Sequence, residues 1–230
     1  MAETIKTKRS DFLKLIAALT MLIDHTARLI EIDYPALFIV MRLIGRLSLP
    51  IYAYYLARGF ACTRSLPKYA LRLAVFAIIS QVPYGLFFND FLYLNIMFTF
   101  LLSLLALYAF TQKWYFTVAG VALVPVCTQI LFGLTVDYSF YGVLLPVLFY
   151  YFDDNKKYAV LSIAALSLMY CLATGDILQA RTYLQMAALL ALPLIFFMRD
   201  KIRLTVHKYF FYIFYPLHLW LLYFAVLLLR

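Results

Sequence analysis

Charged residues are scarce in this sequence. Asp, Glu, Lys and Arg together make up 13% of its 230 residues, about half of the roughly 25% that is usual in soluble domains. The mean hydropathy is correspondingly high, at +0.89. This composition excludes a water-soluble globular domain and directs attention to the membrane.

Strict alternation of apolar and polar residues, which marks the strands of a membrane barrel, is also missing. The apolar runs are about 15–22 residues long, which is the length of membrane helices. Only helices and closed barrels satisfy their backbone hydrogen bonds in lipid. We therefore predict an all-α, polytopic membrane helix bundle.

Cysteine residues are too few to stabilise the fold through a set of disulfides. Cys62, Cys127 and Cys171 are an odd number at unrelated spacings, so we expect neither a disulfide framework nor a metal site. The net charge of +9 is not gathered in a soluble basic module with interleaved aromatic residues, so we expect no nucleic-acid partner.

Turn-forming and charged residues separate the apolar runs into about nine predicted transmembrane helices. No small-residue cleavage site follows the first run, so we interpret it as a retained span. Short connections and the absence of a linker predict a single domain covering residues 1–230. The predicted spans are 12–31, 36–58, 68–88, 92–111, 115–132, 138–152, 157–174, 182–198 and 208–229.

The charges of the connections predict the orientation. The N-terminus and every second connection are basic, whereas the intervening connections hold acidic residues with Arg181 as essentially their one cation. By the positive-inside rule, the N-terminus is cytoplasmic and the C-terminus lies outside. We therefore expect a multi-pass membrane protein, surrounded by lipid, with its basic connections in the cytoplasm.

Polar residues inside the first two predicted spans are costly in lipid, by about 2.5–3.5 kcal/mol for a charge at the centre. A short turn joins these spans, and His25 and Arg42 each lie about six residues from it, or about 9 Å in depth. The two side chains are therefore expected to face one another. The candidates in the two spans are Asp24, His25, Arg28, Arg42, Arg46 and Ser48.

Two interpretations of this group stay open. In the first, His25 acts as a general base or covalent carrier, oriented by Asp24 or Asp137, with arginines that stabilise an oxyanion or bind an anion. In the second, the charges form a structural ion-pair network near the interface. Asp24 and His25 are adjacent and point about 100° apart, which favours a partner for Asp24 on another helix.

His218 follows Pro216 near the middle of the last predicted span. A proline opens the helical hydrogen-bond ladder and leaves carbonyls that need a donor, which an imidazole supplies. A structural role and a catalytic role are both consistent with this position. We expect His207, in a basic connection, to be an ordinary surface residue.

At these residues the sequence resembles the TraX family, whose conjugative-plasmid members are associated with N-terminal acetylation of pilin. TraX-like proteins look like reduced relatives of multi-span acyltransferases that include the acyltransferase-three O-acetylases and the heparan glucosaminide N-acetyltransferase. The matching phrases are LKLIAALTMLIDHTA, GRLSLPIYAYYLARGF, QVPYGLFF, LNIMFTFLLSLLALY, DYSFYGVLLPVLFYYF and KYFFYIFYPLHLWLLY.

The resemblance implies an acetyl-CoA-dependent acyltransferase of the bacterial cytoplasmic membrane, with His25 in the place of the catalytic first-helix histidine. Arg42 and Arg46 match the arginines of a neighbouring helix. Acetyl-CoA is the implied cosubstrate, and its phosphates suit the cytoplasmic cations. The cations predicted to bind it are Arg58, Arg64, Lys68, Arg72 and Arg203.

The sequence leaves the acceptor open among pilin, a glycan, a cell-wall polymer and a lipid beyond the outer membrane face. The alternative function is a small anion- or proton-coupled transporter, or a flippase-like protein, lined by His25, Arg42, Arg46 and His218. No inverted repeat supports this alternative. A structural assembly subunit is a third possibility, in which the buried charges serve no purpose.

Overall fold

The computed structural model describes residues 10–175, 180–198, 202 and 204–229. Its regular structure is helical apart from two strands of two residues each, so the predicted all-α class is confirmed for these parts of the chain. Each of the nine predicted spans coincides with a helix or with two consecutive helices. The helices form two compact units, which are described separately. A single domain over residues 1–230 stays a prediction.

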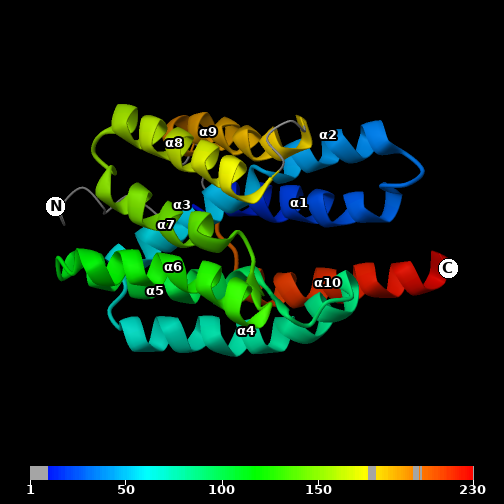
Figure 1. The fold of residues 1–230 in the computed structure, drawn as a ribbon, viewed down its shortest axis with the longest axis horizontal. Helices are drawn as coiled ribbons and strands as arrows, with labels where there is room; N and C mark the ends of the chain where they lie inside the picture. Colours follow the sequence, from blue (N-terminus) through cyan, green and yellow to red (C-terminus); the bar gives the residue numbers. More distant parts are fainter. Residues whose placement is uncertain (1–9, 176–179, 199–201, 203, 230) are drawn as a thin grey trace. The chain divides into compact units, whose positions relative to one another are not determined.

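The first unit comprises residues 1–55 and 154–211. In it α1 and α2 pack side by side as an antiparallel hairpin, and η2 packs against α2 and α8 (Figure 1). Its elements are α1 (Phe12–Ala27), η1 (Arg28–Ile30), α2 (Pro35–Gly45), the first half of α3 (Ser48–Cys62), α8 (Lys156–Thr174), η2 (Ala180–Leu190) and α9 (Ala191–Met198).

The second predicted span is divided into α2 and α3. Pro50 has no N–H, so the carbonyl of Arg46 loses the hydrogen bond that a continuous helix would give it. The helical pattern ends at Gly45, and the N–H of Leu47 donates to the carbonyl of Ile44 in a tighter turn. This break places Arg46 at the carboxyl end of α2.

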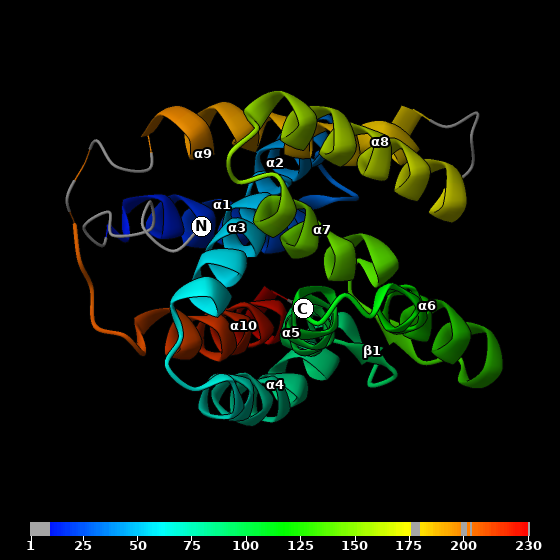
Figure 2. The same cartoon turned by 90° about the vertical axis from the view of Figure 1, so that its left-hand side faces the viewer.

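The second unit comprises residues 56–153 and 212–230. In it α5 packs against α4, α6 and α7, and α10 lies beside α4, where the rings of Phe76 and Tyr212 meet (Figure 2). The two strands pair in parallel, Tyr93 with Thr135 and Leu94 with Val136. The elements are the second half of α3, α4 (Leu66–Phe88), β1 (Tyr93–Leu94), α5 (Ile96–Thr111), α6 (Tyr115–Phe132), β2 (Thr135–Val136), α7 (Ser139–Tyr151) and most of α10 (Phe210–Leu229).

Five helical stretches in the described residues are long and apolar enough to cross a membrane, and three shorter apolar helices accompany them. Helix α1 belongs to neither group, because it has 16 residues and contains Lys14 and Asp24. The structure therefore supports a multi-pass membrane protein, and the count of nine crossings stays a prediction. The five are Pro35–Cys62, Leu66–Phe88, Tyr115–Phe132, Lys156–Thr174 and Phe210–Leu228.

The 3₁₀ helix η2 is unusually long, at 11 residues, since such helices seldom exceed three or four. A 3₁₀ helix rises about 2.0 Å per residue and an α-helix about 1.5 Å. The 3₁₀ form therefore makes η2 longer than an α-helix of the same 11 residues.

Candidate functional site

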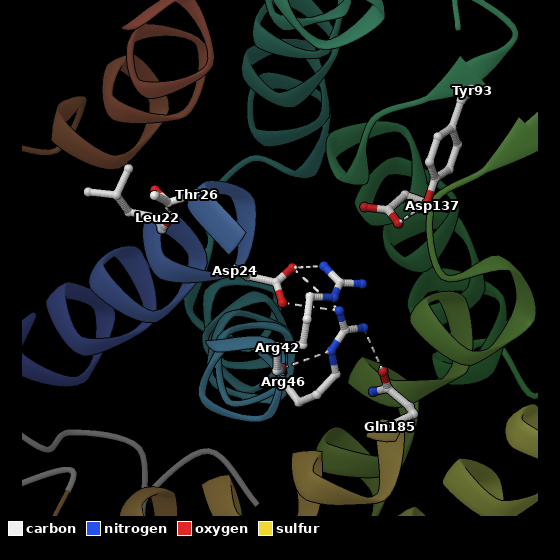
Figure 3. Close-up of polar contacts among 8 residues, drawn as sticks. All are labelled: Leu22, Asp24, Thr26, Arg42, Arg46, Tyr93, Asp137 and Gln185. Carbon is white, nitrogen blue, oxygen red and sulfur yellow. Dashed lines mark hydrogen bonds and ion pairs between the residues drawn. The ribbon is translucent and has the colours of Figure 1, made fainter. Parts of the chain in front are cut away.

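The carboxylate of Asp24 binds Arg42 and Arg46, the two arginines that the sequence predicted for the site (Figure 3). Arg42 Nη1 lies 2.6 Å from Asp24 Oδ2, and Arg46 Nη2 lies 3.1 Å from Asp24 Oδ1. The side chains of Asp24 and Arg46 are about nine-tenths buried, and that of Arg42 is 26% exposed. Asp24 therefore joins α1 to the end of α2 through three charge-assisted hydrogen bonds, one from Arg42 and two from Arg46.

Gly45 makes this contact possible. A Cβ on Gly45 would overlap the carboxyl group and Cβ of Asp24. The absence of a side chain lets α1 and α2 approach closely at the depth of the ion pair. A small residue at the contact is the usual way in which membrane helices achieve such an approach.

Arg46 is held from two further directions. Its Nε donates to the carbonyl of Arg42, 3.4 Å away, which also accepts from the backbone N–H of Arg46. Its Nη1 donates to Oε1 of Gln185 on η2 at 3.1 Å (Figure 3). The guanidinium of Arg46 thus connects α2, α1 and η2.

His25 lies beside this cluster in the last turn of α1. It is half-buried, and its neighbour Asp24 is buried. The ion pairs join Asp24 to α2, as expected for adjacent residues that point in different directions. Arg28 is exposed in η1, and Ser48 is buried at the start of α3. The predicted catalytic role of His25 stays a prediction.

Asp137 belongs to the second unit, so its predicted proximity to His25 stays a prediction. Its side chain accepts a hydrogen bond from the hydroxyl of Tyr93 at 2.8 Å (Figure 3), and its carbonyl accepts one from Thr99 at 2.6 Å. Tyr138 and Ser139 follow with positive φ angles of 58° and 45°. Such a conformation costs a non-glycine residue of order 1–3 kcal/mol.

Tyr93 lies in the connection between α4 and α5, outside the helices. Burial, followed by the charge of Asp137, raises the pKa of the Tyr93 phenol well above its ordinary value of 10.0. The phenol therefore keeps its proton and donates a hydrogen bond to the carboxylate. This arrangement fixes the Asp137 side chain on β1.

The amides of Gln81 and Asn95 bond to each other and to the backbone. Gln81 Nε2 donates to the carbonyl of Tyr93, and Gln81 Oε1 accepts from both the backbone N–H and Nδ2 of Asn95. Asn95 Nδ2 also donates to the carbonyl of Ala77, and Asn95 Oδ1 accepts from the N–H of Met97. The pair therefore caps α5 and attaches it to α4.

His218 is 2% exposed in α10. Its Nδ1 lies 2.9 Å from the carbonyl of Phe214, and its ring stacks on the ring of Phe214. A carbonyl only accepts, so Nδ1 carries the proton in this contact. The carbonyl that Pro216 leaves without its helical donor is that of Tyr212, so both the structural and the catalytic role of His218 stay predictions.

Four of the five predicted CoA-binding cations lie in or beside the connection between α3 and α4. Arg58 lies within α3, Arg64 is exposed in the connection, and Lys68 and Arg72 share a face at the start of α4. The Arg72 guanidinium lies over the Tyr69 ring, 5.6 Å from its centroid. Arg203 lies outside the described residues.

Gln185 and Gly45 belong to the site but were not predicted from the sequence. Gln185 is the one polar residue in the stretch LQMAALLALPL, and that isolation was the available signal. Gly45 has no comparable signal, because its function depends on a neighbour on another helix. Within the ranges that the structure describes, no group of three metal-binding side chains is present.

The comparisons with known proteins agree with the sequence resemblance. The family model described as TraX protein matches residues 9–226. The probable fimbrial assembly protein FimC, serogroup H1, of Dichelobacter nodosus is 30% identical over 233 aligned residues, which cover 91% of this chain and 92% of that protein. An uncharacterized protein of Rickettsia prowazekii (strain Madrid E) is 31% identical over 108 residues, covering 47% of this chain and 40% of that protein.

No solved structure matches the chain. The family assignment therefore rests on the sequence, whose match to the family extends over all the helices from α1 to most of α10. The chain belongs to the TraX family.

Proposed function

We propose that this protein is a membrane acyltransferase that moves an acetyl group from cytoplasmic acetyl-CoA to an amine or hydroxyl acceptor at or beyond the outer membrane face. The observation that carries the proposal is the mostly buried cluster in which Asp24 forms ion pairs with Arg42 and Arg46. Asp24 directly precedes His25 in the sequence. Membership of the TraX family adds support.

In the proposed reaction His25 is the general base. Its imidazole removes a proton from the acceptor as the nitrogen or oxygen attacks the carbonyl carbon of the thioester. The new C–N or C–O bond forms, the C–S bond breaks, and the proton passes to the thiolate of CoA. The arginine cluster offsets the negative charge that develops on the carbonyl oxygen.

Asp24 has a positioning role in this proposal. Ionised and bound by both guanidiniums, it fixes Arg42 and Arg46 in place before substrate arrives, so that the reaction does not have to reorganise them. The cluster is mostly buried, and such charge interactions are stronger there than in water.

The cosubstrate is proposed to bind at the α3–α4 connection. CoA carries several phosphate charges, and Arg64 and Lys68 are exposed cations that can pair with them. In the expected orientation this connection is cytoplasmic. The acceptor class is proposed to be a pilin-like subunit, because one relative is named as a probable fimbrial assembly protein.

The test uses cells that lack the protein and are complemented with the wild type, His25→Ala or His207→Ala. His207 is an exposed residue of the connection before α10, so it is a matched control. Mass spectrometry of envelope proteins and polymers is expected to show a species that carries one acetyl group in wild-type and His207→Ala cells. His25→Ala is expected to lose this species while inserting at the normal level.

Two results would overturn the proposal. One is acetyl transfer from labelled acetyl-CoA by purified His25→Ala protein at the wild-type rate. The other is flux of an anion or protons in liposomes without acetyl-CoA binding, which is the behaviour of the transporter alternative.

A further inference from the structure

Gln185 has a buried hydrogen-bond donor without a partner. Its residue is 5% exposed, and its Nε2 atom is covered and makes no hydrogen bond within the described part of the chain. Its other amide atom, Oε1, accepts from Arg46 at 3.1 Å. Buried donors are nearly always paired in native structures, so this one calls for an explanation.

Rotation of the amide does not remove the problem. The guanidinium of Arg46 has only donors, so the atom that faces it must be the oxygen. The NH₂ group is then fixed on the other side of the amide. An acceptor bonded to Nε2 would therefore be separated from the positive charge of Arg46 only by the amide group of Gln185.

The chemistry of such an acceptor is restricted. It must have a lone pair, and the neighbouring guanidinium favours an atom that is negative or becomes negative, such as a carbonyl oxygen under nucleophilic attack. In Figure 3 the Gln185 amide faces the arginine side chains that Asp24 holds, so this donor belongs to the same cluster.

We infer that Gln185 Nε2 donates a hydrogen bond to the carbonyl oxygen of the transferred acyl group, which becomes an oxyanion during the reaction. This inference rests on the proposed acyl transfer and adds a residue to it. Gln185 thereby performs two tasks through one amide: Oε1 positions Arg46, and Nε2 binds the acyl oxygen.

The element that carries Gln185 can give access to this donor. The atom is covered, so the acyl group reaches it only when η2 moves. A long 3₁₀ helix has poorer hydrogen-bond geometry than an α-helix and is often found at hinges. Closure of η2 over the acyl group would then complete the donor set and exclude water.

The test separates the two tasks with Gln185→Glu. A glutamate keeps the oxygen that accepts from Arg46 and removes the NH₂ donor. Acetyl transfer from isotope-labelled acetyl-CoA to envelope material is measured in membranes containing the wild type, Gln185→Glu or Gln112→Glu. Gln112 is exposed at the end of α5, so its variant makes the same chemical change away from the cluster.

The expected result is a kcat lower by about 10²–10³-fold in Gln185→Glu, with little change in the KM for acetyl-CoA or in the amount of inserted protein. Gln112→Glu should match the wild type. Gln185→Met, which brings no charge and no donor, should lose kcat similarly, and it serves as the test should the glutamate variant not insert.

An unchanged kcat in Gln185→Glu would overturn the inference, and so would a loss confined to Gln185→Met, since both assign Gln185 only the task of holding Arg46. If the wild type transfers acetyl groups and His25→Ala does not, such a result leaves the proposed function intact. If the wild-type protein transfers no acetyl groups, both the proposed function and this inference are wrong.

Discussion

Asp24 on α1 and Gly45 on α2 lie so close together that a side chain on Gly45 would overlap the Asp24 carboxylate. The same carboxylate binds Arg42 and Arg46. The distance between α1 and α2 therefore determines the geometry of the ion pairs. A change at the glycine must disturb the charges.

Gly45→Ala is expected to destabilise the protein by about 1–3 kcal/mol, the usual range for overpacking, and to displace the arginines. Gly120→Ala is the control, because Gly120 lies inside α6 with nothing within 4 Å of an added Cβ. Alanine is the better helix former, so that variant should be as stable as the wild type or more so. Unfolding in detergent, followed by circular dichroism, measures both. Equal stability of the two variants would contradict the contact.

The ion pair of Asp24 and Arg42 predicts a marked asymmetry between single variants. Asp24→Asn leaves two guanidiniums without their shared carboxylate and should cost about 3–5 kcal/mol, as for broken buried pairs. Arg42→Gln should cost less, because the Arg42 side chain is 26% exposed and Asp24 keeps Arg46.

The double variant Asp24→Asn, Arg42→Gln measures the coupling. It should be less destabilised than the sum of the single variants, by about 0.5–3 kcal/mol. Unfolding free energies of the four proteins in mixed micelles complete the cycle. Strictly additive values would mean that the 2.6 Å contact contributes nothing.

Asn95 and Asn155 both cap helices, but they differ in burial. The Asn95 side chain is fully buried and makes two further hydrogen bonds besides its cap bond, whereas Asn155 is exposed and only caps α8. Asn155→Ala should cost about 1 kcal/mol, the usual value for a cap. Asn95→Ala should cost clearly more, because buried partners lose their hydrogen bonds. Similar losses in the two variants would argue against the buried network.

The hydrogen bond from Tyr93 to Asp137 predicts a pH dependence. The raised pKa of Tyr93 means that the folded protein keeps the proton that the unfolded chain releases near pH 10. The stabilising effect is complete below pH 10 and is lost as the pH rises above it. Tyr93→Phe should therefore be less stable at neutral pH and lose stability less steeply above pH 10. Parallel stability profiles between pH 9 and 11 would contradict this expectation.

The sequence by itself determined the class of the protein and its helices. Low charge and long apolar runs require backbone groups to bond within each segment, which only helices achieve here. Prolines and charged connections set most helix ends. The cost of charge in lipid also identified Asp24, Arg42 and Arg46 before any contact was known.

Only the tertiary structure decided how those residues pair. That Asp24 binds both arginines depends on the distance between α1 and α2. Gly45 allows this short distance because it has no side chain. That Gln185 joins the cluster depends on the packing of η2 against α2, because Gln185 is 139 residues from Arg46 in the chain. Periodicity reports which residues share a helix face, but the partner of a polar group is chosen by packing between helices, because packing brings its donors and acceptors within bonding distance.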